Sequence, residues 1–335
     1  MLLLCVKGGC AFVGATIGRP RAMGPSPLQR TRVAQHCRGR RPRRPVLQRE
    51  YPSNVGANCV RPHFEDVAKK EIDMACIINY YNEYDEENRT ASRSGQVEFL
   101  TTMNYIEKYL FPGAKILEIG AATGKYSHTL ARQGYAVDAV ELVPHNIEIF
   151  ESKITDDENI SVVQGDARDL SAFENDIYDI TLVLGPLYHL HEKEDKKKVI
   201  SEALRVTKPG GVVFAAYIIS DGVILDDGII RNKFDIREKI ALGKLDAETF
   251  RTKLEPPDDI FEFVRKEDID DLMQDFSATR LHYLATDLIT RLVSEKINEM
   301  SDEQFDFYFK CHLAICERPD VVGMTVHSLD VFRKK

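Results

Sequence analysis

An apolar run that leads directly into a glycine turn constrains this chain more than any other feature. Residues 115–124 read Lys-Ile-Leu-Glu-Ile-Gly-Ala-Ala-Thr-Gly, so glycines stand at positions 120 and 124. Glycine allows a tight turn and lets a ligand approach the backbone closely. A helix that follows such a turn presents free N–H groups and the positive end of its dipole. The run therefore predicts a buried strand with a ligand site at its carboxyl end.

Two further apolar runs lead to acidic residues. Residues 136–140 are followed by Glu141, and residues 160–163 are followed closely by Gly165 and Asp166. A carboxylate about 20 residues past a glycine turn can accept hydrogen bonds from both ribose hydroxyls. Asp166 is placed to accept a hydrogen bond from an adenine amino group. Each feature alone is equally typical of a strand end or a solvated acid, but together they predict a site for an adenosine-type ligand.

Strands and helices alternate along the middle of the chain. Strands are predicted at 115–119, 136–142, 160–164, 179–184 and 212–219, and helices at 97–110, 125–133, from Pro144 onward and at 194–206, with a Lys-Pro-Gly-Gly turn at 208–211. A helix at 266–276, a strand at 278–285 and a last strand at 325–332 follow. This order predicts an α/β fold with a doubly wound, mostly parallel seven-stranded sheet and an antiparallel last strand.

The alternation breaks twice after the fifth strand. Residues 221–265 are polar and mixed, and residues 287–322 are largely helical in pattern. We expect both segments to be helical lid insertions that lie over the strand ends, within one domain that spans residues 64–335.

Residues 1–49 have a composition unlike that of a folded domain. They contain ten Arg and one Lys but no Asp or Glu. We interpret residues 1–63 as a disordered basic extension that need not belong to the native product, which would then begin near Met74. An organelle-targeting segment, which is typically rich in Arg and poor in acids, is an alternative. A basic arm for an anionic partner is another.

Charge and cysteine content narrow the classes of partner. Beyond residue 49 the chain holds 34 basic and 53 acidic residues, which disfavours a nucleic-acid partner. No apolar stretch approaches the roughly 20 residues that span a bilayer, so we expect no stable membrane insertion.

The seven cysteines form no CxxC pair, which argues against a metal and for reduced thiols. We therefore expect a cytoplasmic protein, or an organellar one if residues 1–49 are a transit segment; the oligomeric state stays open.

The motifs together resemble a known family. Residues 118–124, 140–142, 164–170, 178–180 and 208–211 are similar, in order and spacing, to the motifs of class I S-adenosylmethionine-dependent methyltransferases. The resemblance covers roughly residues 78–220 and is closest to the small-molecule branch that includes ubiquinone/menaquinone C-methylase-like proteins. It implies a Rossmann-like methyltransferase fold and S-adenosyl-L-methionine as cofactor. One departure is Ala122, where the family most often has glycine.

The resemblance also implies a set of cofactor-binding residues. They are Glu118, Gly120, Ala122, Gly124, Glu141, Leu142, Asp166, Ala167, Leu184 and Gly185. Two further candidates come from the segment before the first strand. The ring of Tyr81 can hold a sulfonium cation against its face, and Arg89 can pair with the cofactor carboxylate.

Residues 185–191, Gly-Pro-Leu-Tyr-His-Leu-His, follow the fourth strand where a methyl acceptor is expected. Enzymes that methylate amino groups of nucleic-acid bases have Asn or Asp at the first position, and Gly185 has no side chain to bind a target nitrogen. Tyr188, His189 and His191 are the candidate catalytic residues, since a histidine can act as general base near neutral pH. The alternative interpretation is that one or both histidines only pack or form hydrogen bonds in the wall of the site. His312 and His327 are further candidates without a motif.

The function predicted from these features is direct in-line methyl transfer to a small-molecule acceptor, for which the protein supplies orientation and exclusion of water. A non-catalytic cofactor-binding scaffold on the same fold is the main alternative. A nicotinamide-dependent dehydrogenase is disfavoured because positions 122 and 125 are Ala and Lys instead of Gly. Aminopropyl transfer is disfavoured because residues 185–191 contain no acid.

Overall fold

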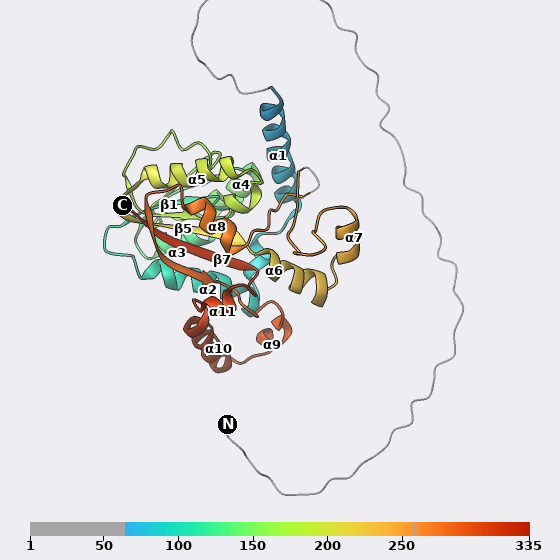
Figure 1. The fold of residues 1–335 in the computed structure, drawn as a ribbon. Helices are drawn as coiled ribbons and strands as arrows, with labels where there is room; N and C mark the ends of the chain where they lie inside the picture. Colours follow the sequence, from blue (N-terminus) through green and yellow to red (C-terminus); the bar gives the residue numbers. More distant parts are fainter. Residues whose placement is uncertain (1–63, 257–258) are drawn as a thin grey trace, which may run out of the picture. The chain divides into compact units, whose positions relative to one another are not determined.

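A single seven-stranded sheet organises the part of the chain that the computed structural model describes, residues 64–256 and 259–335 (Figure 1). The strands are β1 (Lys115–Ile119), β2 (Ala136–Glu141), β3 (Ile160–Gln164), β4 (Tyr178–Val183), β5 (Thr207–Ile218), β6 (Ala278–Ala285) and β7 (His327–Lys334). They lie in the order β3-β2-β1-β4-β5-β7-β6. The extension predicted for residues 1–63 lies outside the described residues.

The direction of the strands confirms the predicted doubly wound sheet. Strands β1 to β5 pair in parallel, whereas β7 runs antiparallel to both β5 and β6. The order reverses between β1 and β4, and ligands of such sheets bind in the crevice at this point. Because β7 is antiparallel, its first residue, His327, pairs with Ile218 near the carboxyl end of β5. His327 therefore lies at the same edge of the sheet as the glycine turn.

Helices cover both faces of the sheet (Figure 1). One face packs against α2 (Arg93–Glu107) and α3 (Lys125–Arg132), and the other against α5 (Lys193–Val206) and α8 (Lys266–Met273). Neighbouring residues of β1 divide between these faces, since Ile116 belongs to the first core and Leu117 to the second. Burial on both faces explains why the parallel strands read as continuous apolar runs.

Two of the predicted strand boundaries are wrong. The Lys-Pro-Gly-Gly segment is not a turn before β5, because the strand already begins at Thr207. Its pairing with β4 jumps from Tyr178–Thr207 to Ile180–Val212, so Pro209 lies where the register shifts and no ladder donor is needed. The last strand begins at His327 instead of residue 325, because the Val326 backbone N–H donates to the Asp287 carboxylate.

The two predicted insertions contain helices, and all of these except α10 are short. Residues 221–265 include α6 (Ser220–Val223), the π-helix η3 (Ile224–Ile230) and α7 (Ile236–Ala241), whereas residues 287–322 include α9 (Ser294–Asn298), α10 (Asp302–Ile315) and α11 (Pro319–Val322). The carboxylate of Asp226, which is fully buried, joins them by accepting hydrogen bonds from Arg231 at 2.7 Å and Arg291 at 2.8 Å. A buried carboxylate needs such cationic partners. That the insertions act as a lid stays a prediction.

The remaining helices frame the sheet edge that carries the glycine turn. They are α1 (Phe64–Glu83), the short helix η1 (Glu87–Thr90), α4 (Pro144–Ser152) and the short helix η2 (Pro186–His189). Pro144 occupies the first turn of α4 as expected, since its missing N–H has no partner there. Within the described residues, no helix combines the length and apolarity that crossing a bilayer requires.

The second glycine of the turn is fixed by both its backbone and its neighbours. Gly124 has a φ of +84°, and a Cβ there would lie 2.7 Å from the ring of Phe150. Gly113 has nearly the same φ, +83°, but nothing lies within 4 Å of its Cβ position. The pair therefore separates the cost of the backbone conformation from the cost of the clash.

We expect Gly113→Ala to lower the free energy of unfolding by about 1–2 kcal/mol, the cost of a left-handed residue with a Cβ. Gly124→Ala should lower it by roughly a further 1–3 kcal/mol because Phe150 must move. Urea denaturation of both variants measures the difference. Equal losses in the two variants would show that Phe150 does not restrict position 124.

Candidate functional site

A cavity of about 970 Å³ lies at the carboxyl edge of the sheet. This volume is at the upper end of the range for ligand sites, roughly 300–1,000 Å³. Of the sequence-predicted site residues, these line it: Tyr81, Arg89, Glu118, Gly120, Ala122, Glu141, Leu142, Asp166, Ala167, Leu184, Gly185, Tyr188, His189 and His191. Gly124, which was predicted to bind the cofactor, does not line the cavity, because it packs against Phe150 behind the turn.

The carboxylate of Glu141 connects the end of β2 to the glycine turn. One oxygen accepts from the backbone N–H of Ala122 at 2.7 Å, and the other accepts from that of Val143 at 2.8 Å. Burial raises the pKa of Glu141, although these backbone bonds oppose the rise. The oxygen next to Val143 also accepts from the side-chain amide of Asn146 at 3.3 Å, whereas the oxygen next to Ala122 keeps a second lone pair that a ribose hydroxyl could use.

Ala122 adopts a backbone conformation that favours glycine. Its φ is +47°, in the left-handed region where a side chain is strained. This explains the departure noted at this position: the turn keeps the shape that a glycine would adopt. The hydrogen bond to Glu141 holds Ala122 in that shape.

Glu118 anchors the helix that follows the turn. Its carboxylate accepts from both the backbone N–H and the hydroxyl of Ser127, in the first turn of α3. Burial raises the pKa of Glu118 to about 8, and the negative charge of Glu141 adds to the rise. Glu118 thus fixes the N-terminus of α3 against β1, directly beneath the glycine turn.

Asp166 follows β3 and is oriented by an arginine that the sequence did not single out. The guanidinium of Arg168 donates to Asp166 at 2.6 Å and to Asp195 at 2.8 Å. The pairing holds the Asp166 carboxylate at the cavity wall beside Ala167. Its contact with an adenine amino group stays a prediction.

Arg89 is already paired within the protein. Its guanidinium donates to Glu86 at 2.6 Å and to Glu98 at 2.8 Å. A cofactor carboxylate would have to share Arg89 with these acids. Lys125, the first residue of α3, is a second cation at the cavity and contacts the hydroxyl of Thr90. Its place directly after the turn was a signal that sequence reasoning overlooked.

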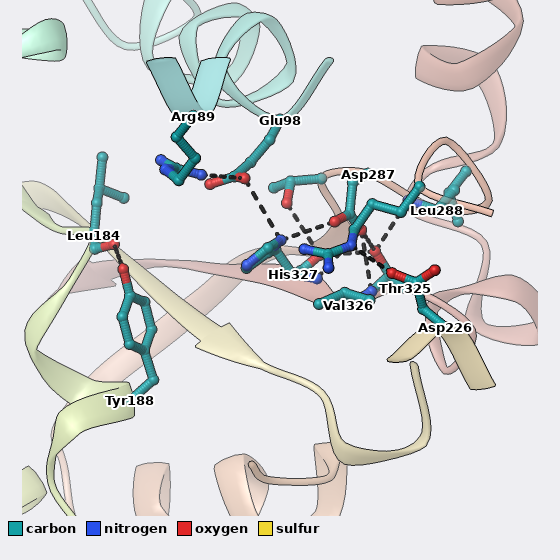
Figure 2. Close-up of polar contacts among 12 residues, drawn as sticks. Arg89, Glu98, Leu184, Tyr188, Asp226, Asp287, Leu288, Thr325, Val326 and His327 are labelled. Carbon is teal, nitrogen blue, oxygen red and sulfur yellow. Dashed lines mark hydrogen bonds and ion pairs between the residues drawn. The ribbon is translucent and has the colours of Figure 1, made fainter. Parts of the chain in front are cut away.

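Aromatic side chains form another wall of the cavity. They include Tyr188 and His189, two of the predicted catalytic residues. His189 is engaged at both ring nitrogens, by the Tyr81 hydroxyl at 3.0 Å and the Ile260 carbonyl at 3.0 Å. Burial lowers the pKa of His189 to about 4. The Tyr188 hydroxyl donates to the Leu184 carbonyl at 3.0 Å, and burial raises its pKa (Figure 2). These residues are therefore built into the wall, and neither is prepared to accept a proton at neutral pH.

A charged cluster lies beside this wall, and the sequence indicated only one of its members. The Nδ1 atom of His327 lies 2.8 Å from Asp287 and 3.5 Å from Glu98 (Figure 2). Burial alone would raise the pKa of Glu98, but Arg89 and His327 lower it to about 2. Arg291 completes the cluster at the cavity. His312, the other candidate without a motif, contacts Thr101 at 2.9 Å and does not line the cavity.

Comparison with known proteins identifies the domain. A family model described as a methyltransferase domain matches residues 117–215. The demethylmenaquinone methyltransferase of Clavibacter sepedonicus is 34% identical over 134 residues, which are 40% of this chain and 51% of that protein. The ubiquinone biosynthesis O-methyltransferase of Xylella fastidiosa strain M23 is 31% identical over 122 residues, 35% of this chain and 47% of that protein.

A solved S-adenosylmethionine-dependent methyltransferase from Methanosarcina mazei matches 69% of this chain and 96% of its own, at 18% identity and a TM-score of 0.45. The chain spans about half the length of the curated relatives that it matches. The matched segment runs from β1 to β5 and contains the turn, Glu141 and Asp166. The family model therefore identifies residues 117–215 as a methyltransferase domain and confirms the family resemblance.

We expect Glu141→Gln to destabilise the protein without any ligand by roughly 1–3 kcal/mol, because one of two backbone N–H groups then faces an amide donor. Chemical denaturation measures the loss. Glu148→Gln, which changes an exposed carboxylate on α4, is the matched control and should stay within about 0.5 kcal/mol of the native chain. A native-like Glu141→Gln would mean that the turn does not depend on this carboxylate.

We expect the neutral state of His189 to make the protein sensitive to acid. Its folded pKa, about 4, lies below the usual 6.5, so its contribution is complete above pH 6.5 and is lost as the pH falls toward 4. Between pH 7 and 5 the free energy of unfolding should fall by about 1–2 kcal/mol more in the native chain than in His189→Gln. Denaturation at several pH values gives both slopes. Identical slopes would mean that His189 titrates normally.

Proposed function

We propose that this chain is an S-adenosylmethionine-dependent methyltransferase that acts on a small-molecule acceptor by direct in-line transfer. The observation that carries the proposal is the convergence of residues from the ends of β1, β2, β3 and β4 on one cavity. The glycine turn, Glu141 and Asp166 enter that cavity from three different strands. A site of this composition suits a nucleoside with a polar tail.

The residues present fit the cofactor. At Gly120 a Cβ would lie 2.6 Å from Pro186, so the wall of the cavity leaves no room for a side chain there. Glu141 and Asp166 offer acceptors for hydroxyl and amino groups, and Tyr81 offers an aromatic face. When bound, S-adenosylmethionine supplies a methyl group that is already activated on a sulfonium. The chain's own residues orient the two reactants and exclude water.

The insertions at residues 221–265 and 287–322 are proposed to be the lid. Val223, Phe261, Phe263, Arg291 and Asn298 from these segments line the same cavity as the glycine turn. Closure over the reactants would remove water from the site, a common task of such loops. We assign acceptor choice to these segments, because they line the cavity apart from the glycine turn, Glu141 and Asp166, the proposed cofactor site.

The acceptor is proposed to be a small molecule and not a nucleic acid. Gly185 cannot bind a target nitrogen through a side chain, and the domain is strongly acidic. The two relatives described above are named for menaquinone and ubiquinone chemistry, which is compatible with this class. We propose a cytoplasmic location because Cys76, Cys311 and Cys316 are free thiols.

Isothermal titration of the full chain with S-adenosylhomocysteine tests the cofactor assignment. We expect binding, and Asp166→Ala should weaken it about tenfold, the effect of losing roughly 1.4 kcal/mol. The control is Asp169→Ala, an exposed acid three residues along, which should leave the affinity within twofold. No binding by the native chain would contradict the proposal.

A methyl-transfer assay with radiolabelled S-adenosylmethionine and a small-molecule metabolite extract then tests catalysis. Transfer to an extract component is the expected result. Binding without transfer to any component would favour the non-catalytic scaffold.

A further inference from the structure

His327 occupies a position at the cavity that no motif indicated. It is the first residue of β7 and pairs with Ile218 near the end of β5, next to β4 in the sheet. Its imidazole lines the same cavity as Leu184 and Gly185, which directly follow β4, and as Tyr188 of η2. The side chain retains 19% of its exposure, so it is open to this cavity although charged groups surround it.

Asp287 fixes the orientation of this ring. Its carboxylate lies 2.8 Å from Nδ1 of His327, so the neutral imidazole keeps its proton on Nδ1 and leaves the Nε2 lone pair free to accept one. The carboxylate is itself held by the backbone N–H groups of Val326 at 3.1 Å and His327 at 3.2 Å and by the Thr325 hydroxyl. A histidine oriented by a fixed acid is the arrangement that general bases use.

The surrounding charges suit a base. Burial opposes protonation of His327, but Glu98 and Asp287 outweigh it and raise the pKa, while Arg291 acts in the opposite direction. Arg89 is paired with Glu98, and Asp226 and Asp227 are paired with Arg291. His189, in contrast, has both nitrogens engaged and a pKa near 4.

We propose that His327 is the general base of the methyl transfer and that Asp287 is its positioning residue. The inference rests on the proposed function and adds that the acceptor is a hydroxyl or amine. Nε2 removes the proton from the acceptor O–H or N–H as the oxygen or nitrogen lone pair forms a bond to the methyl carbon. The carbon–sulfur bond breaks, and its electron pair stays on sulfur. The imidazolium then releases its proton to solvent.

The first test needs no acceptor. NMR titration of the full chain saturated with S-adenosylhomocysteine reports the tautomer and the titration of each imidazole. We expect His327 to be protonated on Nδ1 when neutral, and Glu98→Gln should lower its titration midpoint. A neutral ring that carries its proton on Nε2, or a His327 that does not titrate between pH 5 and 9, would overturn the proposal.

The second test uses the methyl-transfer assay with the metabolite extract as the acceptor probe. His327→Asn keeps an N–H toward Asp287 but removes the base, so turnover should fall about 10²-fold or more. Affinity for S-adenosylhomocysteine should stay within twofold, and His145→Asn, an exposed change on α4, should retain full turnover. In Glu98→Gln the acid limb of the rate profile should move to lower pH.

Two outcomes separate this inference from the proposed function. Turnover by His327→Asn equal to that of the native chain overturns the base assignment alone. Absence of S-adenosylhomocysteine binding by the native chain refutes the proposed function instead. If the native chain binds but does not turn over the extract, the tautomer and midpoint of His327 decide the inference.

Discussion

The carboxylate of Glu141 makes the interaction on which the rest of the site depends. It binds the backbone N–H groups of Ala122 and Val143, and so joins the end of one strand to the turn that follows another. Hydrogen bonds from backbone N–H groups to a charged acceptor are among the stronger ones in proteins. They also retain Ala122 in a left-handed conformation that it would not prefer. The cavity beyond the strand ends keeps its shape because this turn cannot relax.

The edge of the sheet divides into two regions with different chemistry. Around β1, β2 and β3 lie the turn and the acids suited to a nucleoside, whereas around β4, β5 and β7 lie aromatic rings and a cluster of opposite charges. The reversal of strand order between β1 and β4 separates these regions, and the antiparallel β7 brings its first residue to the same edge. One cavity can therefore hold a cofactor and an acceptor side by side.

The histidines show how local sequence and tertiary environment differ as guides to chemistry. Residues 188–191 lie next to the expected acceptor, which made His189 an attractive base. Its ring nitrogens are instead occupied by Tyr81 and the Ile260 carbonyl, groups that are distant in the sequence. His327 had no motif around it, yet Asp287 and Glu98 meet it from two other segments of the chain.

The sequence by itself determined the strands, their order of appearance and the residues at their ends, because apolar runs and glycine turns depend on neighbours along the chain. It also determined the family, through motifs in which spacing is fixed by the strand-turn-helix unit. It did not determine where β5 and β7 begin, since their first residues depend on pairing with β4 and on the Asp287 carboxylate. Only the tertiary structure decided which side chains already have hydrogen-bond or ion-pair partners within the protein and which remain open to the cavity. The physical reason is that the partners of His189 and His327 include Tyr81 and Glu98, which lie in segments more than 100 residues away in the sequence, and local pattern carries no record of them.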